Sequence, residues 1–547
     1  MTRARLNQIS IVMSFCLLVI AGLATRFSLM TVSLWEDESW VANSVLTPSL
    51  SEMFHYEKWL QTSPPLFLVL LRASTSVFGR NEVALRLVPW LAGAISVVLV
   101  SVVLTRLFPA GLAVVGTFFF LTNYWAVKYS QQVKQYTADL LVSSLFVFLL
   151  LSYLRDGQKR RTFWALVLTG GIGIFLSYAA VFWFPVTLLA IATFPRSQEF
   201  SSFEGALAKD FLHTRSVRSL VALSAYLSCL GLADLFFIRS NRSPGLVDFW
   251  KDDFIGSGGL LNSGVRFLAN YCNLMVPQRI SWAGPLSFVM GLVVLATLVR
   301  AGIASIRGDS KALNLLFVTT LPVLVALTMS VFRQYPLLTY PRMIIWLLPL
   351  CTLLLVYAVE PIWTYWTAKA GVPASNASVA GLTGLLCVLA VYFSSAGAGG
   401  TNGQNARAAV LYLKNQAGPR DELFVRGITA EQFNYYSELL HWRPASTYVA
   451  NTNLPCCLRA GKVVPQGLAD LGFAQDIHSF AGLASGKGAW FLMERGDYHK
   501  MLETIRREMA TAGCRSVEKK DFENLSLARF DCPSFLFVPT AARADAP

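Results

Sequence analysis

The sequence predicts an α-helical polytopic membrane protein that carries a small soluble α/β domain at its C-terminal end. Of its 547 residues, 54% are hydrophobic and 14% are charged, and the mean hydropathy is +0.50. Soluble globular chains carry roughly a quarter charged residues. Apolar stretches of about twenty residues, long enough to cross the hydrocarbon core, recur along the first 395 residues. After residue 396 the composition becomes that of a soluble domain.

The charge balance fits a membrane protein. The formal net charge is +14 and the pI is about 9.4. Lysines and arginines gather in the cytoplasmic loops of membrane proteins, where they set the topology, and this explains most of the surplus. The chain has no nucleic-acid motif and no basic stripe with interleaved aromatic residues, so a nucleic-acid partner is not expected.

About eleven spans are expected, because each apolar stretch can cross the membrane. Residues 9–30 follow a basic N-terminus, lack a clear cleavage site, and are therefore expected to form an uncleaved first helix. Residues 66–78 are too short to span and are expected to form an interfacial or re-entrant helix. The further expected spans are 83–104, 109–122, 138–153, two short spans within 162–194 with a turn near 176–178, 219–238, 281–298, 313–332, 343–357 and 378–393.

This order of spans places the N-terminus in the cytoplasm and the C-terminal domain outside. The strongest basic loop, residues 155–161, falls on the cytoplasmic side, as the positive-inside rule requires. If 162–194 were one tilted span instead of two, every later loop would change side. The expected location is the inner (plasma) membrane, crossed many times and in contact with membrane lipid.

Three regions are expected: a transmembrane domain over 1–395, a Gly- and Asn-rich linker over 396–404, and an extracytoplasmic α/β domain over 405–547. The pattern in the last region predicts helices at 405–416, 430–440 and 498–512, and strands at 422–426, 489–493 and near the end. Cys514 and Cys532 are expected to form a disulfide if this domain faces an oxidising compartment.

The candidate site begins in the first outer loop, between Ser33 and Arg72. Three consecutive acids, Glu36–Glu38, lie close to an apolar segment, and tryptophans bracket them as aromatics do at a membrane–water boundary. Carboxylates near a membrane are costly unless they are solvated or paired, so this placement suggests a function. The alternative interpretation is a solvated acidic surface or a helix cap.

Four polar stretches are expected on the outer face of the membrane. They are residues 37–38, 128–136, 239–251 and 333–342. Arginine binds phosphate well because its fork contacts two oxygens, and a carboxylate can take a proton from an attacking hydroxyl. Together these stretches favour a phosphorylated substrate that resides in the membrane, a lipid-linked phosphate.

The same stretches carry a family resemblance. Its motifs are Trp-x-Asp-Glu-Ser at 35–39, Ser-Pro-Pro-Leu at 63–66, Phe-Gly-Arg-Asn-Glu-Val-Ala-Leu-Arg-Leu at 78–87, Tyr-Ser-Gln-Gln-Val-Lys-Gln-Tyr at 129–136 and Tyr-Pro-Arg-Met at 340–343. In this order they resemble the polytopic GT-C glycosyltransferases, in the branch of the protein O-mannosyltransferases and the bacterial aminoarabinose and lipopolysaccharide-core sugar transferases. The resemblance implies a GT-C transmembrane domain and transfer, with inversion, from a polyprenyl-phosphate sugar at the outer face. The acceptor would be a lipid, a polysaccharide or a protein.

The resemblance also implies residue roles. Asp37 is the expected general base, and Glu38 is expected to position the donor or the acceptor. Lys134 stands where the family often has arginine, and Tyr136 matches the family's tyrosine. Arg342 matches a late arginine that is expected to bind phosphate.

Two further positions complete the expected substrate contacts. Arg86 matches the arginine of the Ala-Leu-Arg-Leu motif, which either contacts substrate or anchors the end of its helix. Gln132 stands where the family has an acid, which removes a second carboxylate from this stretch. Asp139, one helical turn after Tyr136, is the candidate replacement.

No cofactor is assigned from the sequence. A divalent cation is compatible with the pair of acids at 37–38, but no third ligand is evident. The alternative function is a transporter or flippase of a lipid-linked sugar, which would also need many spans and buried cations. Transporters carry broken helices at the membrane midplane and related halves, and this sequence shows neither an internal repeat nor such breaks.

Overall fold

The protein is described by a computed structural model, in which the chain divides into two compact units. The residues that the structure describes are 16, 18–20, 22–24, 26–27, 30–55, 59, 61–155, 159–193, 207–239, 250–275, 283–339, 341–369, 405–444, 446–450, 477 and 480–534. Unit 1 comprises Met1–Met30, Thr62–Gly79 and Val83–Gly399. Unit 2 comprises Thr31–Gln61, Arg80–Glu82 and Gly400–Pro547.

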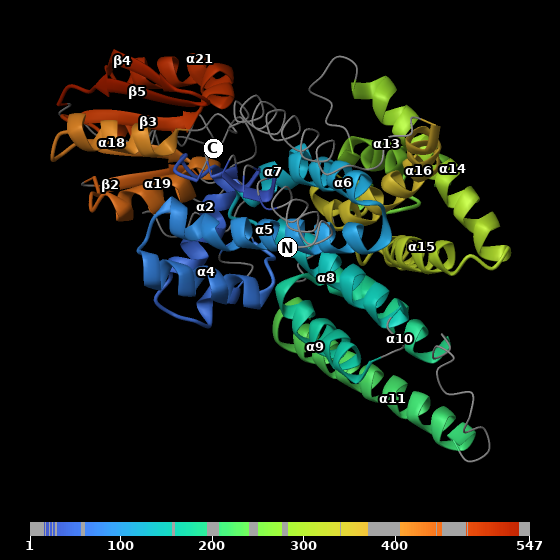
Figure 1. Ribbon diagram of the computed structural model, residues 1–547. Coiled ribbons are helices and arrows are strands. Elements are labelled where there is room, and N and C mark those ends of the chain that lie inside the picture. The colour runs from blue at the N-terminus through green and yellow to red at the C-terminus, as the bar shows by residue number, and fades with distance from the viewer. Residues whose placement is uncertain are drawn as a thin grey trace, which may run out of the picture. The chain divides into compact units, whose positions relative to one another are not determined.

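Unit 1 is helical throughout its described part (Figure 1). Its helices are α4 (Pro65–Phe78), α5 (Glu82–Leu107), α6 (Ala110–Thr122), α7 (Tyr124–Ser130), α8 (Tyr136–Arg155), α9 (Arg160–Leu176), α10 (Trp183–Thr193), α11 (Leu207–Ala233), α13 (Leu260–Met275), α14 (Ala283–Ile306), α15 (Ser310–Val331) and α16 (Leu348–Lys369). Short turns of other helix types are η2 (Tyr178–Phe182), η3 (Asp234–Ile238), η5 (Lys251–Asp253), η6 (Pro341–Met343) and η7 (Ile345–Leu347).

The described helices support fewer spans than the sequence predicted. Six of them are long and apolar enough to cross a membrane, or seven if α6 and α7, bent by 52° at their junction, form one broken span. The two short spans expected within 162–194 correspond to two helical segments, α9 and the run from Tyr178 to Thr193. Both are shorter than the six helices that are long enough to cross a membrane. The expected spans at 378–393 and, for the most part, 9–30 lie outside the described residues.

Two helix boundaries have local causes. Between α9 and η2, Ser177 adopts an extended backbone, which ends the helix at the turn that the sequence predicted. Between α6 and α7, the side chain of Asn123 accepts hydrogen bonds from the amides of Trp125 and Ala126. Such a cap satisfies N–H groups that a new helix leaves free, so the polar stretch predicted to be a loop begins with a short helix instead.

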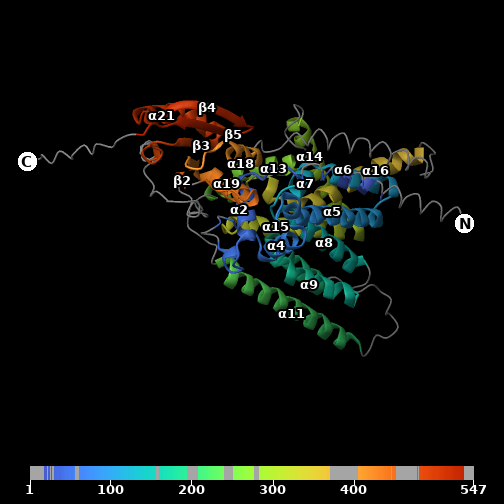
Figure 2. The ribbon, with the colours of Figure 1, turned by 90° about the vertical axis from the view of Figure 1, so that its left-hand side faces the viewer.

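Small residues allow helices of unit 1 to pack closely. A Cβ atom added at Gly170 on α9 would lie 2.2 Å from a ring carbon of Tyr226 on α11. The Tyr226 hydroxyl donates to the Leu166 carbonyl at 3.0 Å, which fixes the ring against α9. Glycine at such a contact lets two helix backbones approach in a membrane. Helices α9 and α11 accordingly run side by side (Figures 1 and 2).

Unit 2 contains a mixed five-stranded sheet among its described residues. Its strands are β1 (Glu422–Arg426), β2 (Ser446–Ala450), β3 (Gly488–Glu494), β4 (Arg515–Phe522) and β5 (Leu525–Asp531), in the order β2-β1-β3-β5-β4. Strand β1 pairs in parallel with β2 and β3, and β5 pairs antiparallel with β3 and β4. Its helices are α2 (Glu36–Leu46), η1 (Glu52–Phe54), α18 (Ala406–Gln416), α19 (Gly427–Leu439) and α21 (Arg495–Thr511).

The buried strands of this sheet alternate between two apolar faces. Phe424, Phe491 and Phe530 belong to the cluster that also contains Ile505 and Met509 of α21. Trp490, the next residue along β3, instead contacts Tyr412 of α18. A sheet that buries both faces needs helices on each side, and this requirement fits the α/β domain predicted from the sequence.

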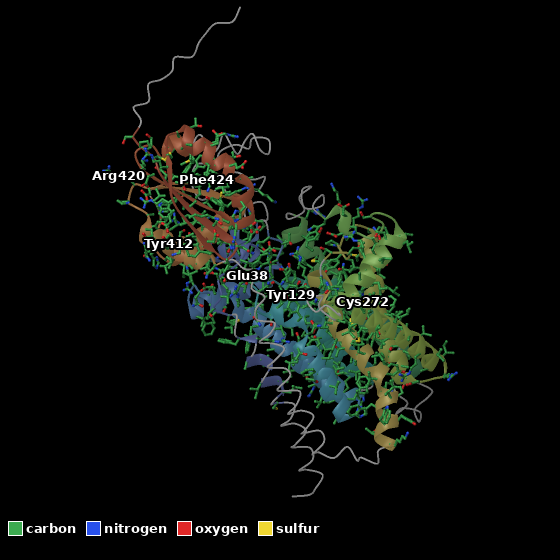
Figure 3. All side chains as sticks on the ribbon, turned by 90° about the horizontal axis from the view of Figure 1, so that it is seen from above. Glu38, Tyr129, Cys272, Tyr412, Arg420 and Phe424 are labelled. Carbon is green, nitrogen blue, oxygen red and sulfur yellow. A yellow bond between two sulfur atoms is a disulfide. The ribbon has the colours of Figure 1, made fainter. Side chains whose placement is uncertain are left out.

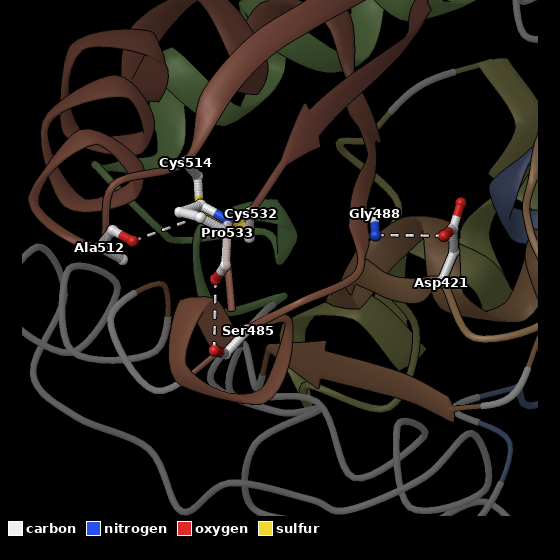
Figure 4. Close-up of a disulfide and its surroundings, with 7 residues drawn as sticks. All are labelled: Asp421, Ser485, Gly488, Ala512, Cys514, Cys532 and Pro533. Atoms are coloured by element: carbon white, nitrogen blue, oxygen red, sulfur yellow. Dashed lines mark hydrogen bonds between the residues drawn. A yellow bond between two sulfur atoms is a disulfide. The ribbon is translucent and has the colours of Figure 1, made fainter. Parts of the chain in front are cut away.

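The expected disulfide is present. Cys514 and Cys532 are bonded, and they flank the hairpin of β4 and β5 at its open end (Figure 4). Beside it, the Asp421 carboxylate accepts a hydrogen bond from the Gly488 amide at 3.1 Å, at the start of β3. The disulfide links two segments 18 residues apart and ties together the start of β4 and the end of β5.

Candidate active site

The three neighbouring acids lie in the first turn of a helix. Glu36, Asp37 and Glu38 open α2 in unit 2, so this part of the expected loop is helical. Negative side chains at a helix N-terminus are stabilised by the helix dipole, which explains why this acidic run begins a helix. Asp37 is half-buried, and its side chain therefore keeps access to solvent.

Glu38 has a structural contact. Its carboxylate accepts a hydrogen bond from the Trp35 amide at 3.2 Å, and the residue is 1% exposed (labelled in Figure 3). A glutamate at the third helical position often closes the first turn in this way. Of the neighbouring acids, Asp37 is thus the more accessible and Glu38 the more buried.

Three expected substrate residues lie where α7 passes into α8 in unit 1. Gln132, Lys134 and Tyr136 are each less than 10% exposed. Residues 131–135 form a tight turn, in which the Lys134 amide donates to the Gln132 carbonyl at 2.8 Å. A buried lysine is costly unless anions or dipoles compensate its charge, so this turn suits an anionic group.

An aromatic ladder spans this turn, near the segment that carries Arg342. The rings of Trp125 and Tyr129 stack with centroids 5.6 Å apart, and those of Tyr129 and Tyr136 lie 4.8 Å apart. Arg342 lies in η6, which packs against α7, and its guanidinium is 5.6 Å from the Trp250 ring centroid. Unit 1 therefore brings the turn that carries Arg342 next to the helix that carries Tyr129 (labelled in Figure 3).

Asp139 lies within α8, one turn beyond Tyr136, and is 7% exposed. Ser177 donates a hydrogen bond to its carboxylate at 2.6 Å. This bond ties the turn at residues 176–178 to α8.

Tyr335 lies near the same acid. Burial, followed by the charges of Asp139 and Tyr136, raises the pKa of the Tyr335 phenol well above its ordinary value. The hydroxyl therefore keeps its proton and donates to the Met343 carbonyl at 2.6 Å. This bond holds the segment that carries Arg342.

Arg86 lies in the second turn of α5 and is buried. Its guanidinium donates to the Met30 carbonyl at 3.3 Å. Of the two roles expected for Arg86, substrate contact or anchoring of the helix end, this contact with a backbone carbonyl fits the anchoring role.

Some residues of the cluster were missed by sequence reasoning. Tyr129, Trp250 and Tyr335 were not assigned roles, although Tyr129 lies within one of the quoted motifs. The only sequence signal for the stacked rings of Trp125 and Tyr129 is their spacing of four residues, which places two side chains on the same face of a helix.

The acids and the cations belong to different compact units. Asp37 and Glu38 are in unit 2, and Gln132, Lys134, Tyr136, Arg86 and Arg342 are in unit 1. Their assembly into one site stays a prediction. Within the described part of the chain, no three His, Cys, Asp or Glu side chains cluster closely enough to hold a metal ion.

The comparison with protein families identifies one segment. Residues 62–209 match the family described as dolichyl-phosphate-mannose-protein mannosyltransferase. This segment contains Arg86, Gln132, Lys134 and Tyr136, whereas Asp37 precedes it. No curated protein matches the sequence.

Solved structures resemble the whole chain. ArnT from Cupriavidus metallidurans in the apo state aligns with a TM-score of 0.52 at 14% identity, over 94% of this chain and 97% of ArnT. The same protein bound to undecaprenyl phosphate gives 0.51, again at 14% identity and with the same coverage. The oligosaccharyltransferase AglB from Archaeoglobus fulgidus, in complex with an inhibitory peptide and a dolichol-phosphate, gives 0.45 at 12% identity, over 90% of this chain and 70% of AglB. The ArnT comparison shows the fold, and with the family match it confirms the resemblance predicted from the sequence.

Proposed function

We propose that this chain is a polyprenyl-phosphate-sugar-dependent glycosyltransferase of the protein mannosyltransferase and ArnT superfamily. The family match over residues 62–209 and the polytopic membrane fold support this proposal. It moves the sugar, with inversion, to a hydroxyl of an acceptor at the outer face of the cytoplasmic membrane. The acceptor is a lipid, a polysaccharide or a protein.

The observation that carries this proposal is the family match over residues 62–209. That segment includes the buried Lys134, in the turn between α7 and α8, and the Tyr129–Tyr136 ring pair. A cation and aromatic rings suit a sugar phosphate, because an ammonium pairs with phosphate and rings cover the apolar faces of a sugar.

The reaction needs a base and a phosphate site. Asp37 takes the proton from the acceptor hydroxyl as the hydroxyl oxygen attacks the anomeric carbon. The bond from that carbon to the phosphate oxygen breaks on the opposite side, which inverts the configuration. Lys134 and Arg342 stabilise the negative charge that the leaving polyprenyl phosphate gains. Tyr136 and Gln132 contact the donor, and Glu38 holds the first turn of α2.

The site faces outward, with the N-terminus in the cytoplasm and unit 2 outside. The bonded pair Cys514–Cys532 supports this orientation, because disulfides persist in oxidising compartments and are rare in the cytosol. The transmembrane region is 1–395, the linker 396–404 and the outer domain 405–547. No cofactor is assigned.

The test compares the wild type with Asp37→Asn in membranes that contain a radiolabelled polyprenyl-phosphate sugar pool, with expression matched by immunoblot. Loss of a general base lowers a rate by about 10²–10⁴-fold. The control is Glu36→Gln, which removes one negative charge from the same helix turn. We expect transfer to fall at least a hundredfold in Asp37→Asn and less than threefold in Glu36→Gln.

Three other results would contradict the proposal. Equal transfer by the wild type and Asp37→Asn would remove Asp37 from the chemistry. Equal losses in both variants would assign the effect to the helix dipole and not to a base. No transfer by the wild type, combined with movement of labelled lipid between leaflets, would favour the flippase.

A further inference from the structure

We infer that helix α19 is a positioning element that fixes the Asp37 helix, and that Tyr436 and Gln432 are its positioning residues. The inference rests on the proposed function only in that Asp37 is the base. It gives the C-terminal region a positioning part in the reaction, exerted through the helix that carries Asp37. All of the residues involved belong to unit 2.

The first contact is a clamp on the backbone of Leu34, three residues before Asp37. The Leu34 amide donates to the Tyr436 hydroxyl at 2.7 Å, and the Gln432 side-chain amide donates to the Leu34 carbonyl at 3.2 Å. Tyr436 and Gln432 are four residues apart on α19, so both side chains project from one face. Both backbone groups of a buried residue are thereby satisfied by a segment about 400 positions away in the sequence.

The Tyr436 hydroxyl is itself held in place. It donates to a carboxylate oxygen of Glu82 at 3.1 Å while it accepts from Leu34. Glu82 is 2% exposed and also pairs with the Arg407 guanidinium at 3.4 Å. A phenylalanine at position 436 would keep the ring but lose both bonds, leaving a buried amide and a buried carboxylate each short of one partner.

The far end of the Asp37 helix is also attached to α19. The Asn43 side-chain amide donates to the Glu431 backbone carbonyl at 2.9 Å and to the Glu431 carboxylate. Val41 and Val45, on either side of Asn43 in α2, are at most 1% exposed, and α2 packs along α19. Helix α2 is therefore held at both ends and along one face by α19.

This arrangement fixes where Asp37 points. The internal bond from Trp35 to Glu38 sets the first turn of α2, and the clamp sets the position of that turn relative to α19. Misplacement of a reacting group by about 1 Å can cost on the order of a hundredfold in rate. Releasing the clamp should therefore lower kcat while the donor, bound by other residues, keeps its KM.

The experiment uses the full-length protein in lipid nanodiscs. Tyr436→Phe removes the hydroxyl, and Gln432→Leu removes the second half of the clamp. The control is Tyr498→Phe, which removes a hydroxyl from another buried tyrosine of the same domain, on α21. Hydrogen–deuterium exchange of the peptide that covers residues 31–47 reports the clamp directly. Transfer of the radiolabelled sugar gives kcat and KM.

We expect exchange at Leu34 and in the first turn of α2 to rise at least tenfold in both clamp variants and to stay unchanged in the control. We expect kcat, calculated per folded protein, to fall about tenfold, which corresponds to about 1.4 kcal/mol, with KM for the donor within twofold. Both clamp variants should melt below the control, because buried groups lose hydrogen-bond partners, so the assays are run below their melting temperatures. A purely structural role would lower only the amount of folded protein and would leave kcat per folded protein at the wild-type value.

Either of two results would overturn the inference. Unchanged exchange over residues 31–47 would show that the clamp does not hold α2. Raised exchange with wild-type kcat would show that the position of α2 does not matter to the reaction. Failure of the proposed function is detected by a different experiment. In that case Asp37→Asn would transfer sugar at the wild-type rate, whether or not hydrogen–deuterium exchange over residues 31–47 changes in the clamp variants.

Discussion

Replacing Ser177 with alanine tests whether the pair Ser177–Asp139 holds the centre of unit 1 together. The serine hydroxyl lies 2.6 Å from the carboxylate, and both residues are buried, at 0% and 7% exposure. A hydrogen bond contributes about 0.5–1.5 kcal/mol net, and leaving a buried polar partner unsatisfied costs about 1–3 kcal/mol. We expect Ser177→Ala to lower the free energy of unfolding by about 2 kcal/mol, because the buried Asp139 carboxyl loses its donor.

The matched control is Ser144→Ala. Ser144 is also fully buried, but its hydroxyl donates to the Leu140 carbonyl four residues earlier in the same helix. That carbonyl can still accept its helical N–H bond after the change, so we expect a loss below about 1 kcal/mol. The comparison separates the loss of a hydroxyl from the loss of the bond to Asp139.

Thermal unfolding in detergent can be followed with a fluorogenic maleimide. Cys272 and Cys351 are buried free thiols of unit 1, and they become reactive only when the helices separate. Ser177→Ala should unfold several degrees below Ser144→Ala. Equal melting temperatures for the two variants would refute the reasoning. A second test is the double variant Asp139→Asn with Ser177→Ala. If its loss of unfolding free energy equals the sum of the two single losses, the reasoning is also refuted, because residues joined by one hydrogen bond should not be additive.

Two further changes test packing and the covalent link. Gly170→Ala should lower the free energy of unfolding by about 1–3 kcal/mol, because the new methyl group would overlap the Tyr226 ring. Gly231→Ala on α11, where a Cβ atom meets nothing within 4 Å, is the control and should be neutral in the same melts. The double variant Cys514→Ser with Cys532→Ser should lower the free energy of unfolding of unit 2 by about 3 kcal/mol. The bond joins residues 18 positions apart, and closing a loop of about 15 residues contributes about that much. Limited proteolysis of membranes with and without dithiothreitol measures this loss, and equal digestion of wild type and variant would contradict it.

The sequence by itself predicted the membrane character, the spans that the structure describes and the resemblance to the family whose model matches residues 62–209. Hydropathy is a property of each segment alone, because a helix in lipid satisfies its own backbone groups and needs only enough apolar residues. The break at Ser177 and the elements of the C-terminal domain followed from local patterns. The expected oxidising surroundings of this domain also led to the prediction of the Cys514–Cys532 bond, which is present. Strand β2 was not predicted; it lies at the edge of the sheet and is stabilised by its pairing with β1.

Tertiary structure decided what surrounds the candidate catalytic groups. The packing of η6 against α7 joins residues more than 200 positions apart, and the clamp from Leu34 to Tyr436 spans about 400. No local period encodes such contacts. They arise because buried backbone and side-chain groups must find hydrogen-bond partners wherever the fold brings them. For that reason the sequence could nominate Asp37 as the base, while only the folded chain showed that α19 holds the helix on which it lies.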